Sequence, residues 1–447
     1  MSKEVKVVKK KRKLNGQKIF NLISFTFMLA CIIFYGSRFI KLYLENNKKE
    51  EIKVIADNIK ENNEETLENI NGDYYFKGKE VNNYIKYSNI LFRIIKINKD
   101  NSITIISDKP ITSLAKGNSK DYTSSYINKW LNNQNQENTG ILENNLNNPS
   151  KYLTYTNTCN DKITDTKNIT CKEKQEETLI TIPSMHDYIN TGDTNSFMNN
   201  ETYYYLINTN KDNKTWYVND NGGVTTSDNT DIIGIKPVLT LKNTTKLING
   251  DGTKEKPYTF EEEQSMLGSY IKLGNDLWRV YEINDNILKL SLDNYLTINN
   301  EEIIYKYSDK GYYHNDTKQN TLAYYLNNSY LNKLTYNNNI KENSFANGIY
   351  SNTTNYDYTK VLTTTVPTKV TVLSIGNIII NSDNTNYFLS TGIDTNSNLV
   401  YVMTNDFKLY TKNATNKLKI VPTISINKEI LTSGEGTKDS PLEANNE

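Results

Sequence analysis

The sequence predicts an α+β fold that occurs twice in tandem behind a single membrane-spanning helix. A basic N-terminal segment runs directly into an apolar one, which is typical of a membrane anchor. The stretch "YIKYSNILFRIIKIN" (84–98) returns as "YIKLGNDLWRVYEIN" (270–284), with eight of fifteen positions identical. Short β-type runs dominate each copy, with a helical pattern between them. At roughly 100 to 200 residues per domain, 447 residues leave room for such a duplication.

The N-terminal residues predict a single-pass topology. Residues 1–18 carry eight Lys or Arg and are expected in the cytoplasm. Residues 19–40 reach the roughly 20 residues that a helix needs to cross about 30 Å of hydrocarbon, with Arg38 snorkelling to the interface. A cleavable signal peptide is the rival interpretation, but apolar residues continue past Ala30-Cys31, the only small-residue pair. We therefore expect a cell-membrane protein with its C-terminal domains extracellular.

The remaining chain divides into a stalk and two copies of one domain. Residues 41–71 are highly charged and predict a helical or disordered stalk, with a short coiled coil as the alternative. Residues 72–260 form the first copy and 266–447 the more divergent second copy. Landmarks return in order, as "YINKWLNN" and "LAYYLNN", "IKPVLTL" and "IVPTISI", and "GDGTKEKPY" and "GEGTKDSPL". A repeat this long indicates duplicated globular domains, because solenoid units run to only about 50 residues.

Each copy predicts a buried strand and a helix. "ILFRIIKI" carries apolar side chains on both faces, as a central strand does. Ile127, Trp130 and Leu131 share one helix face after a Ser124 cap, and residues 322–326 repeat the spacing. The glycine-rich "GDGTKEKPY" fits neither a P-loop nor an EF-hand, so we expect a turn that leads out of the domain.

The charge balance and the few cysteines and histidines limit the classes of function that fit this sequence. With 52 basic and 51 acidic residues, the chain has no electrostatic reason to bind nucleic acid. Cys159 and Cys171 are the only cysteines beyond the membrane segment and predict a disulfide. No further ligands cluster near them in sequence, so no metal site and no cofactor are predicted. The only histidines, His186 and His314, lie at non-equivalent positions of the two copies. No common catalytic motif occurs.

Two arginines are the main candidate site residues. Only four of the 52 basic residues are arginines, which leaves 48 lysines, yet Arg93 and Arg279 occupy the same position of the repeat. Their apolar neighbours require the guanidinium to be paired. We favour an internal contact in which the arginine fixes its strand to a carboxylate or loop. The alternative is that the arginine forms the floor of a ligand groove.

Trp216 is a further candidate site residue. It lies near the tyrosines of "YYYL" (203–206) in sequence and could stack on a sugar, although packing is the commoner role of such a tryptophan.

The motifs together resemble a known class of bacterial surface domain. Its pattern is a W-R-V strand, a W-L-N helix and a G-V-R-P strand. The matching residues are 92–94 and 278–280 for the strand, 130–132 for the helix and 234–237 for the late strand, where the second copy has "KIVP". That family is similar to the C-type-lectin-like and formylglycine-generating-enzyme fold. The resemblance therefore implies two tandem C-type-lectin-like mixed α/β domains.

The family has no settled activity that the resemblance transfers. Formylglycine-generating enzymes use paired cysteines, and the chain offers only Cys159 and Cys171. The triplets of calcium-dependent lectins are missing from the sequence. We therefore expect a non-enzymatic protein that binds a glycan, a wall polymer or another protein at the cell surface. The alternative is an envelope-acting enzyme or a thiol oxidase.

Overall fold

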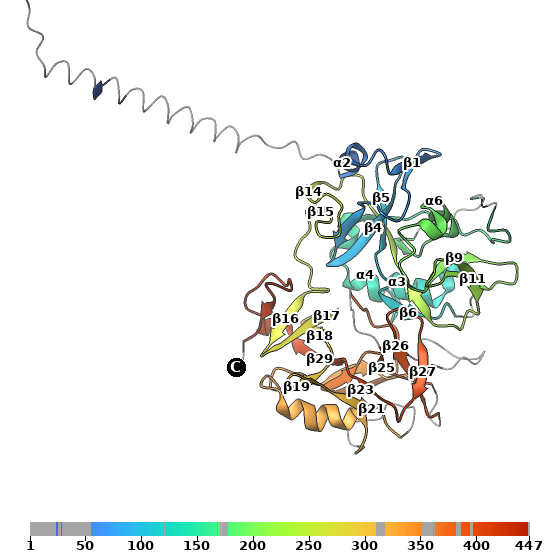
Figure 1. Ribbon diagram of the computed structural model, residues 1–447. Helices are drawn as coiled ribbons and strands as arrows, with labels where there is room; N and C mark the ends of the chain where they lie inside the picture. The colour runs from blue at the N-terminus through green and yellow to red at the C-terminus, as the bar shows by residue number, and fades with distance from the viewer. Residues whose placement is uncertain are drawn as a thin grey trace, which may run out of the picture. The chain divides into compact units, whose positions relative to one another are not determined.

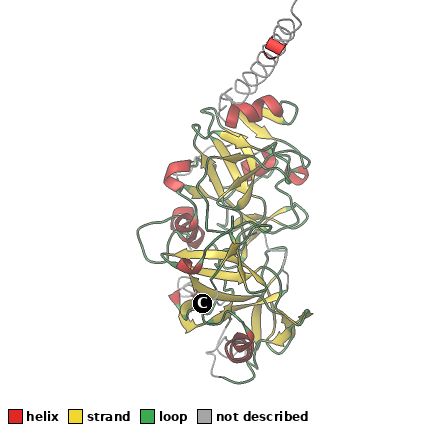
Figure 2. Cartoon of the chain, turned by 90° about the vertical axis from the view of Figure 1, so that its left-hand side faces the viewer, coloured by secondary structure: helices red, strands yellow, loops and turns green. Residues whose placement is uncertain are grey.

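β-Strands make up most of the regular secondary structure, with 37% of the residues in strands and 15% in helices (Figure 2). The α+β class with two mixed α/β domains, predicted from the sequence, is therefore wrong, whereas the resemblance to C-type-lectin-like domains stays a prediction. The physical reason is the length of the helical patterns. The best of them, around Trp130, yields the helix α3 (Tyr126–Leu131) of only six residues, whereas most other apolar runs are short and become strands.

The computed structural model describes residues 24–25, 28, 55–117, 119, 121–167, 169, 171, 178–309, 318–350, 361, 363–380, 386–393 and 397–445. The predicted cytoplasmic segment 1–18 lies outside these residues, as do residues 41–54 of the predicted stalk and nearly all of the predicted membrane helix 19–40. Within the described part of the chain, no helix is both long and apolar enough to cross a bilayer. Residues 53–447 form one compact unit.

The first copy holds two sheets (Figure 1). The larger has the order β1-β2-β4-β5-β13-β7, with β3 on β4 and β8 on β13, and the smaller has the order β11-β10-β9-β12-β6. Their bounds are β1 Leu67–Ile70, β2 Asp73–Phe76, β3 Tyr84–Tyr87, β4 Ile90–Ile97, β5 Ile103–Ser107, β6 Thr112–Leu114, β7 Leu153–Thr154, β8 Ile180–Thr181, β9 Tyr204–Thr209, β10 Thr215–Val218, β11 Val224–Ser227, β12 Ile233–Ile235 and β13 Val238–Leu241.

The second copy repeats this plan. Its sheets run β24-β29-β18-β17-β16-β30 and β21-β28-β25-β26-β27. Their bounds are β16 Tyr270–Leu273, β17 Asp276–Asn284, β18 Ile287–Leu292, β21 Ile304–Lys306, β24 Val370–Val372, β25 Tyr387–Gly392, β26 Leu399–Met403, β27 Tyr410–Asn413, β28 Lys417–Lys419, β29 Pro422–Asn427 and β30 Leu442–Glu443. Three two-stranded ribbons complete the strands, formed by β14 Leu247–Asn249 with β15 Thr259–Phe260, β19 Thr297–Ile298 with β20 Glu301–Glu302, and β22 Asn343–Ala346 with β23 Thr365–Thr368.

The two copies agree in the details of strand pairing. The β4–β5 ladder shifts register between Ile94 and Lys96, and the β17–β18 ladder shifts between Val280 and Glu282, 186 residues later. The single parallel contact of the smaller sheet, β9 with β12, recurs as β25 with β28. β-Bulges are built-in features of a fold. The repeated stretch therefore encodes a repeated sheet.

The glycine-rich segments turn at the end of each copy and contact its first repeated strand. The carbonyl of Gly252 accepts a hydrogen bond from the Tyr84 N–H at 2.8 Å, and that of Gly436 accepts one from the Tyr270 N–H at 2.9 Å. Gly252 has a φ of +80°, and a Cβ there would lie 2.3 Å from the Asn82 carbonyl oxygen. Only glycine fits so close an approach. The end of each copy is thus fastened to its first repeated strand.

The helices are short and begin at side-chain caps where the sequence supplies them. Ser125, not Ser124, caps α3 by accepting a hydrogen bond from the Asn128 N–H. Ser184 and Asp187 form a capping box at the start of α6. The helices are α2 Ile55–Asn62, α3 Tyr126–Leu131, α4 Ile141–Asn145, α5 Pro149–Tyr152, α6 Met185–Asn190 and α7 Leu322–Tyr324, which continues as a π-turn over Tyr325–Tyr330.

Part of the predicted stalk belongs to the folded unit. Ile55, Ala56 and Ile59 of α2 are buried in the core, and β1 pairs with β2 at the sheet edge. The helix-like spacing of the isoleucines in this charged segment therefore marks a face that packs on the first copy.

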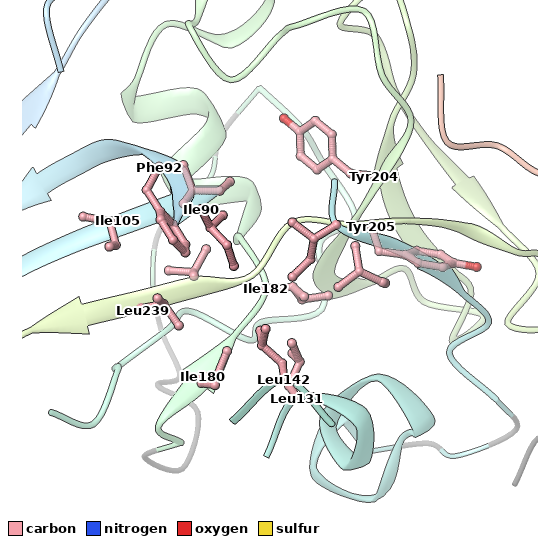
Figure 3. Close-up of a cluster of buried hydrophobic side chains, with 14 of the residues drawn as sticks. Ile90, Phe92, Ile105, Leu131, Leu142, Ile180, Ile182, Tyr204, Tyr205 and Leu239 are labelled. Carbon is pink, nitrogen blue, oxygen red and sulfur yellow. The ribbon is translucent and has the colours of Figure 1, made fainter. Parts of the chain in front are cut away.

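The hydrophobic core runs from the first copy into the second. Side chains of β4, β5 and β13 gather with Leu131 of α3 and Leu142 of α4 (Figure 3). The same cluster includes Ile378, Ile379 and Ile380 of the second copy. Polar contacts cross the boundary as well, because the Trp130 indole N–H donates to the Gly376 carbonyl at 2.8 Å. The two copies are packed domains, with shared apolar contacts between them.

Candidate functional site

Arg93 on β4 is 6% exposed and is held on several sides. Its Nε donates to the Asn83 side-chain oxygen, and an Nη donates to the Val81 carbonyl at 3.1 Å. The other Nη lies 3.8 Å from an Asp108 carboxylate oxygen, which makes an ion pair. The guanidinium also lies 3.8 Å from the Tyr84 ring centroid and 4.9 Å from that of Phe197. Burial lowers the pKa of Arg93, but an arginine stays charged at neutral pH.

A groove of about 550 Å³ lies over this arginine. Tyr84, Arg93, Asp108 and Phe197 contribute to its wall, and the rim carries charged and amide side chains of both hydrogen-bonding types. The rim residues are Lys79, Glu80, Asn82, Lys109, Asn199, Asn200, Glu201, Lys254 and Glu255. Both alternatives drawn from the sequence therefore stay predictions at Arg93. It forms an internal ion pair, and it lines a groove.

Behind the groove lies a buried lysine that the sequence did not single out as a site residue. Lys236 is 1% exposed, and its Nζ lies 4.8 Å from the Tyr204 ring centroid. Burial lowers the pKa of Lys236 to about 7, with the nearby Arg93 charge acting in the same direction and Asp108 acting against it. The first copy thus concentrates two basic side chains around one buried carboxylate.

At the matching position of the second copy, the arginine lies beside a much smaller cavity. Arg279 on β17 is half-buried, with its Nε 3.2 Å from the Gly268 carbonyl and its guanidinium 4.4 Å from the Tyr270 ring centroid. Asp293 follows β18 as Asp108 follows β5, and Lys438 pairs with it at 3.1 Å. The cavity beside Arg279 and Asp293 has only about 20 Å³. Ile378, Ile379, Ile380 and Val421 fill its apolar side.

Trp216 on β10 lies away from the groove. It is half-buried against the core, and its indole N–H donates to the Ile163 carbonyl at 3.3 Å. The structure thus assigns Trp216 a packing contact with the loop that follows Cys159, and none of the residues that line the Arg93 groove belong to β10.

Cys159 and Cys171 form a disulfide, with their Cα atoms 5.6 Å apart. The fold brings His186 next to this pair, so that one ligand atom from each of the three residues lies within 4.8 Å of the others. The sequence predicted no metal ligands here because His186 is 15 residues beyond Cys171. Only the first turn of α6 places it there.

Comparison with protein-family models found no match for the chain, and comparisons with curated proteins and with solved structures found none either. The resemblance to a bacterial surface domain stays a prediction, and the site is interpreted from its own geometry.

The sequence identified Arg93 as a candidate site residue but did not identify the residues that contact it. Tyr84 and Asp108 flank the arginine through neighbouring strands, and each has a counterpart in the second copy, Tyr270 and Asp293. An alignment of the copies that marked every shared polar or aromatic residue would have found them. Lys236 has no such signal, because Val421 stands at its place in the second copy.

Proposed function

We propose that the chain is a non-enzymatic surface protein that binds a polyhydroxylated ligand, such as an envelope glycan or wall polymer, in the Arg93 groove of its first copy. The proposal includes a single-pass anchor at residues 19–40 with a cytoplasmic N-terminus, which rests on the sequence pattern alone. The observation that carries the proposal is the groove itself, with an arginine and an aromatic ring in its wall and amides around its rim.

The chemistry of the groove suits hydroxyl groups and acidic substituents. The lysines and the Asn82 amide are hydrogen-bond donors, whereas Glu80, Glu201 and Glu255 are acceptors. An arginine is fitted to bidentate contact with a carboxylate, and the fixed contacts of Arg93 to Asn83 and Val81 hold its fork in one orientation. Because the Arg93 guanidinium is positioned before a ligand arrives, little of its side-chain entropy is lost on binding.

A matched pair of variants tests the proposal. The full chain in detergent micelles is applied to an array of neutral, amino and acidic oligosaccharides and soluble cell-wall fragments. We expect binding of at least one acidic or amidated member by the wild type, about a tenfold or greater loss in Arg93→Lys, and no loss in Arg279→Lys. Equal losses in the two variants, or no binding to any member, would refute the proposal. Unfolding midpoints check that both variants are folded.

A further inference from the structure

The disulfide loop of the first copy is fixed against α6 by one buried side chain. The Asn208 amide of β9 donates to the carbonyls of Cys159 at 3.0 Å and Asp161 at 2.9 Å. Its oxygen accepts the Met185 N–H, the first of α6, at 2.7 Å. Asn208 is fully buried. The cysteine loop and the histidine of α6 therefore have a defined relative position without the disulfide.

Three side chains with metal-ligating atoms meet at this junction, and a fourth, Asp161, lies near the histidine. One ligand atom each of Cys159, Cys171 and His186 falls within a 4.8 Å group, and His186 Nε2 lies 4.0 Å from an Asp161 carboxylate oxygen. His186 and Asp161 are only 8% and 7% exposed, whereas Cys171 is exposed and Cys159 half-buried. A buried histidine thus lies beside a partly exposed cysteine pair, with the buried Asp161 carboxylate next to the histidine.

We propose that reduction of the Cys159–Cys171 disulfide creates a binding site for a borderline-soft divalent cation, Zn²⁺, with the two thiolates, His186 and Asp161 as ligands. Zinc prefers a tetrahedral set of sulfur, nitrogen and oxygen donors at about 2.0 to 2.3 Å. Ligand atoms around such an ion lie roughly 3.3 to 3.8 Å apart. The histidine and carboxylate atoms, now 4.0 Å apart, are close to that spacing.

The reaction that opens the site has a defined balance. A dithiol reductant attacks a sulfur, supplies two electrons and two protons to the pair, and becomes a cyclic disulfide. The S–S bond is replaced by two S–H groups. Zinc binding then displaces both thiol protons and uses the neutral imidazole. Cys171 is an exposed residue, which gives the reductant access to the disulfide. The same loop is therefore closed either by a covalent bond or by a metal ion.

The site differs from the groove of the proposed function in both its residues and its chemistry. None of its four ligands lines the Arg93 groove. None of the four has a counterpart of the same type in the second copy, where the chain has no cysteine. A failure of one proposal therefore leaves the other open to its own test.

Cobalt(II) titration of the full chain in detergent tests the inference, with Cys31→Ser as the background so that no third thiol is present. The chain is reduced with dithiothreitol and desalted without oxygen. We expect one equivalent of cobalt with the intense absorption of a tetrahedral site and a thiolate-to-cobalt charge-transfer band, both removed by one equivalent of zinc. The oxidised chain is expected to give neither band.

Variants and a second measurement guard against loss of folding. His186→Ala is expected to weaken cobalt binding at least tenfold, whereas replacement of the other histidine, His314→Ala, is expected to leave it unchanged. X-ray absorption at the zinc edge of the unmutated ligand set is expected to give two sulfur and two nitrogen or oxygen neighbours. Absence of the charge-transfer band in the reduced chain, equal binding by His186→Ala, or a zinc shell without sulfur would overturn the inference.

Discussion

The two copies share a fold but differ around their matched arginines. In the first copy, Arg93 is buried beside Asp108 and lines a groove of about 550 Å³. In the second, the space beside Arg279 is about 20 Å³, and isoleucines 378–380 occupy its apolar side. Ile379 also donates its N–H to the Ile111 carbonyl of the first copy at 2.7 Å. The second copy thus uses this region as a packing surface, and the first leaves it open.

The same arginine position can therefore have different surroundings in the two copies of one fold. Both copies share the arginine, the tyrosine on the preceding strand and the aspartate after the following strand, which suits a structural role for these three residues. The two copies differ in the residues around these three side chains. Lys236 is replaced by Val421, and Lys438 pairs with Asp293 at 3.1 Å. The matching lysine of the first copy, Lys254, is on the rim of the groove.

The largest expected effect comes from removing the first arginine. Arg93→Ala leaves the buried Asp108 without its ion-pair partner, and breaking such a pair costs about 3 to 5 kcal/mol. Arg279→Ala is expected to cost less, about 1 to 2 kcal/mol, because Arg279 is half-buried and water solvates part of its charge and of the groups around it. Urea unfolding of the full chain in detergent measures both. Equal losses of unfolding free energy in the two variants would contradict the expected difference between Arg93 and Arg279.

A smaller loss is expected from the disulfide, which only the first copy has. Cys159→Ser with Cys171→Ser opens a loop with a sequence separation of 12, and the chain-entropy estimate for a loop of that size is about 3 kcal/mol. Differential scanning calorimetry under oxidising conditions measures the change. A reduced wild type is expected to unfold with the double variant, provided that zinc is chelated. An unchanged transition would mean that Asn208 alone fixes the loop.

The smallest expected effect is a pH dependence from Lys236. Its pKa in the folded chain is about 7, whereas an unfolded lysine titrates near about 10.4. Between these values the unfolded chain binds the extra proton, so stability rises with pH, by at most about 1.4 kcal/mol per unit. We expect Lys236→Met to lose this slope between pH 7 and 9. Lys116, whose pKa burial lowers to about 8, contributes equally to both proteins and cancels.

A Lys236→Met variant that keeps the full wild-type slope would contradict the burial of this amine. The comparison between copies also predicts a control. Val421→Ala, at the matching position, is expected to lower stability through lost packing and to leave the pH slope unchanged, because no titrating group is altered.

The sequence predicted the duplication because identical residues at a constant offset reflect identical strand pairing. It also predicted the burial of "ILFRIIKI", whose apolar residues lie on both faces. The sequence pattern predicted the wrong fold class, because the apolar stripe formed by Ile127, Trp130 and Leu131 belongs to a helix of fewer than two turns. Pattern alone does not give the length of a helix when Ser125 and Asn132 bound it so closely.

The site was less predictable than the fold. Arg93 stood out because arginine is rare in this chain, and its ion pair follows from the burial of its neighbours. The groove depends on the approach of segments far apart in sequence, among them residues 79–84, 197–201 and 253–255. His186 meets Cys159 and Cys171 in the same way, through tertiary contacts of Asn208. Such approaches have no local sequence signal.

Hydrogen–deuterium exchange of the full chain, with and without the strongest oligosaccharide from the array, tests most directly whether the open copy is the binding copy. We expect slower exchange on ligand binding for backbone amides at 80–84 and 199–201 and no change at 268–280. Protection at 268–280, or no protection near Arg93 at a saturating ligand concentration, would contradict it.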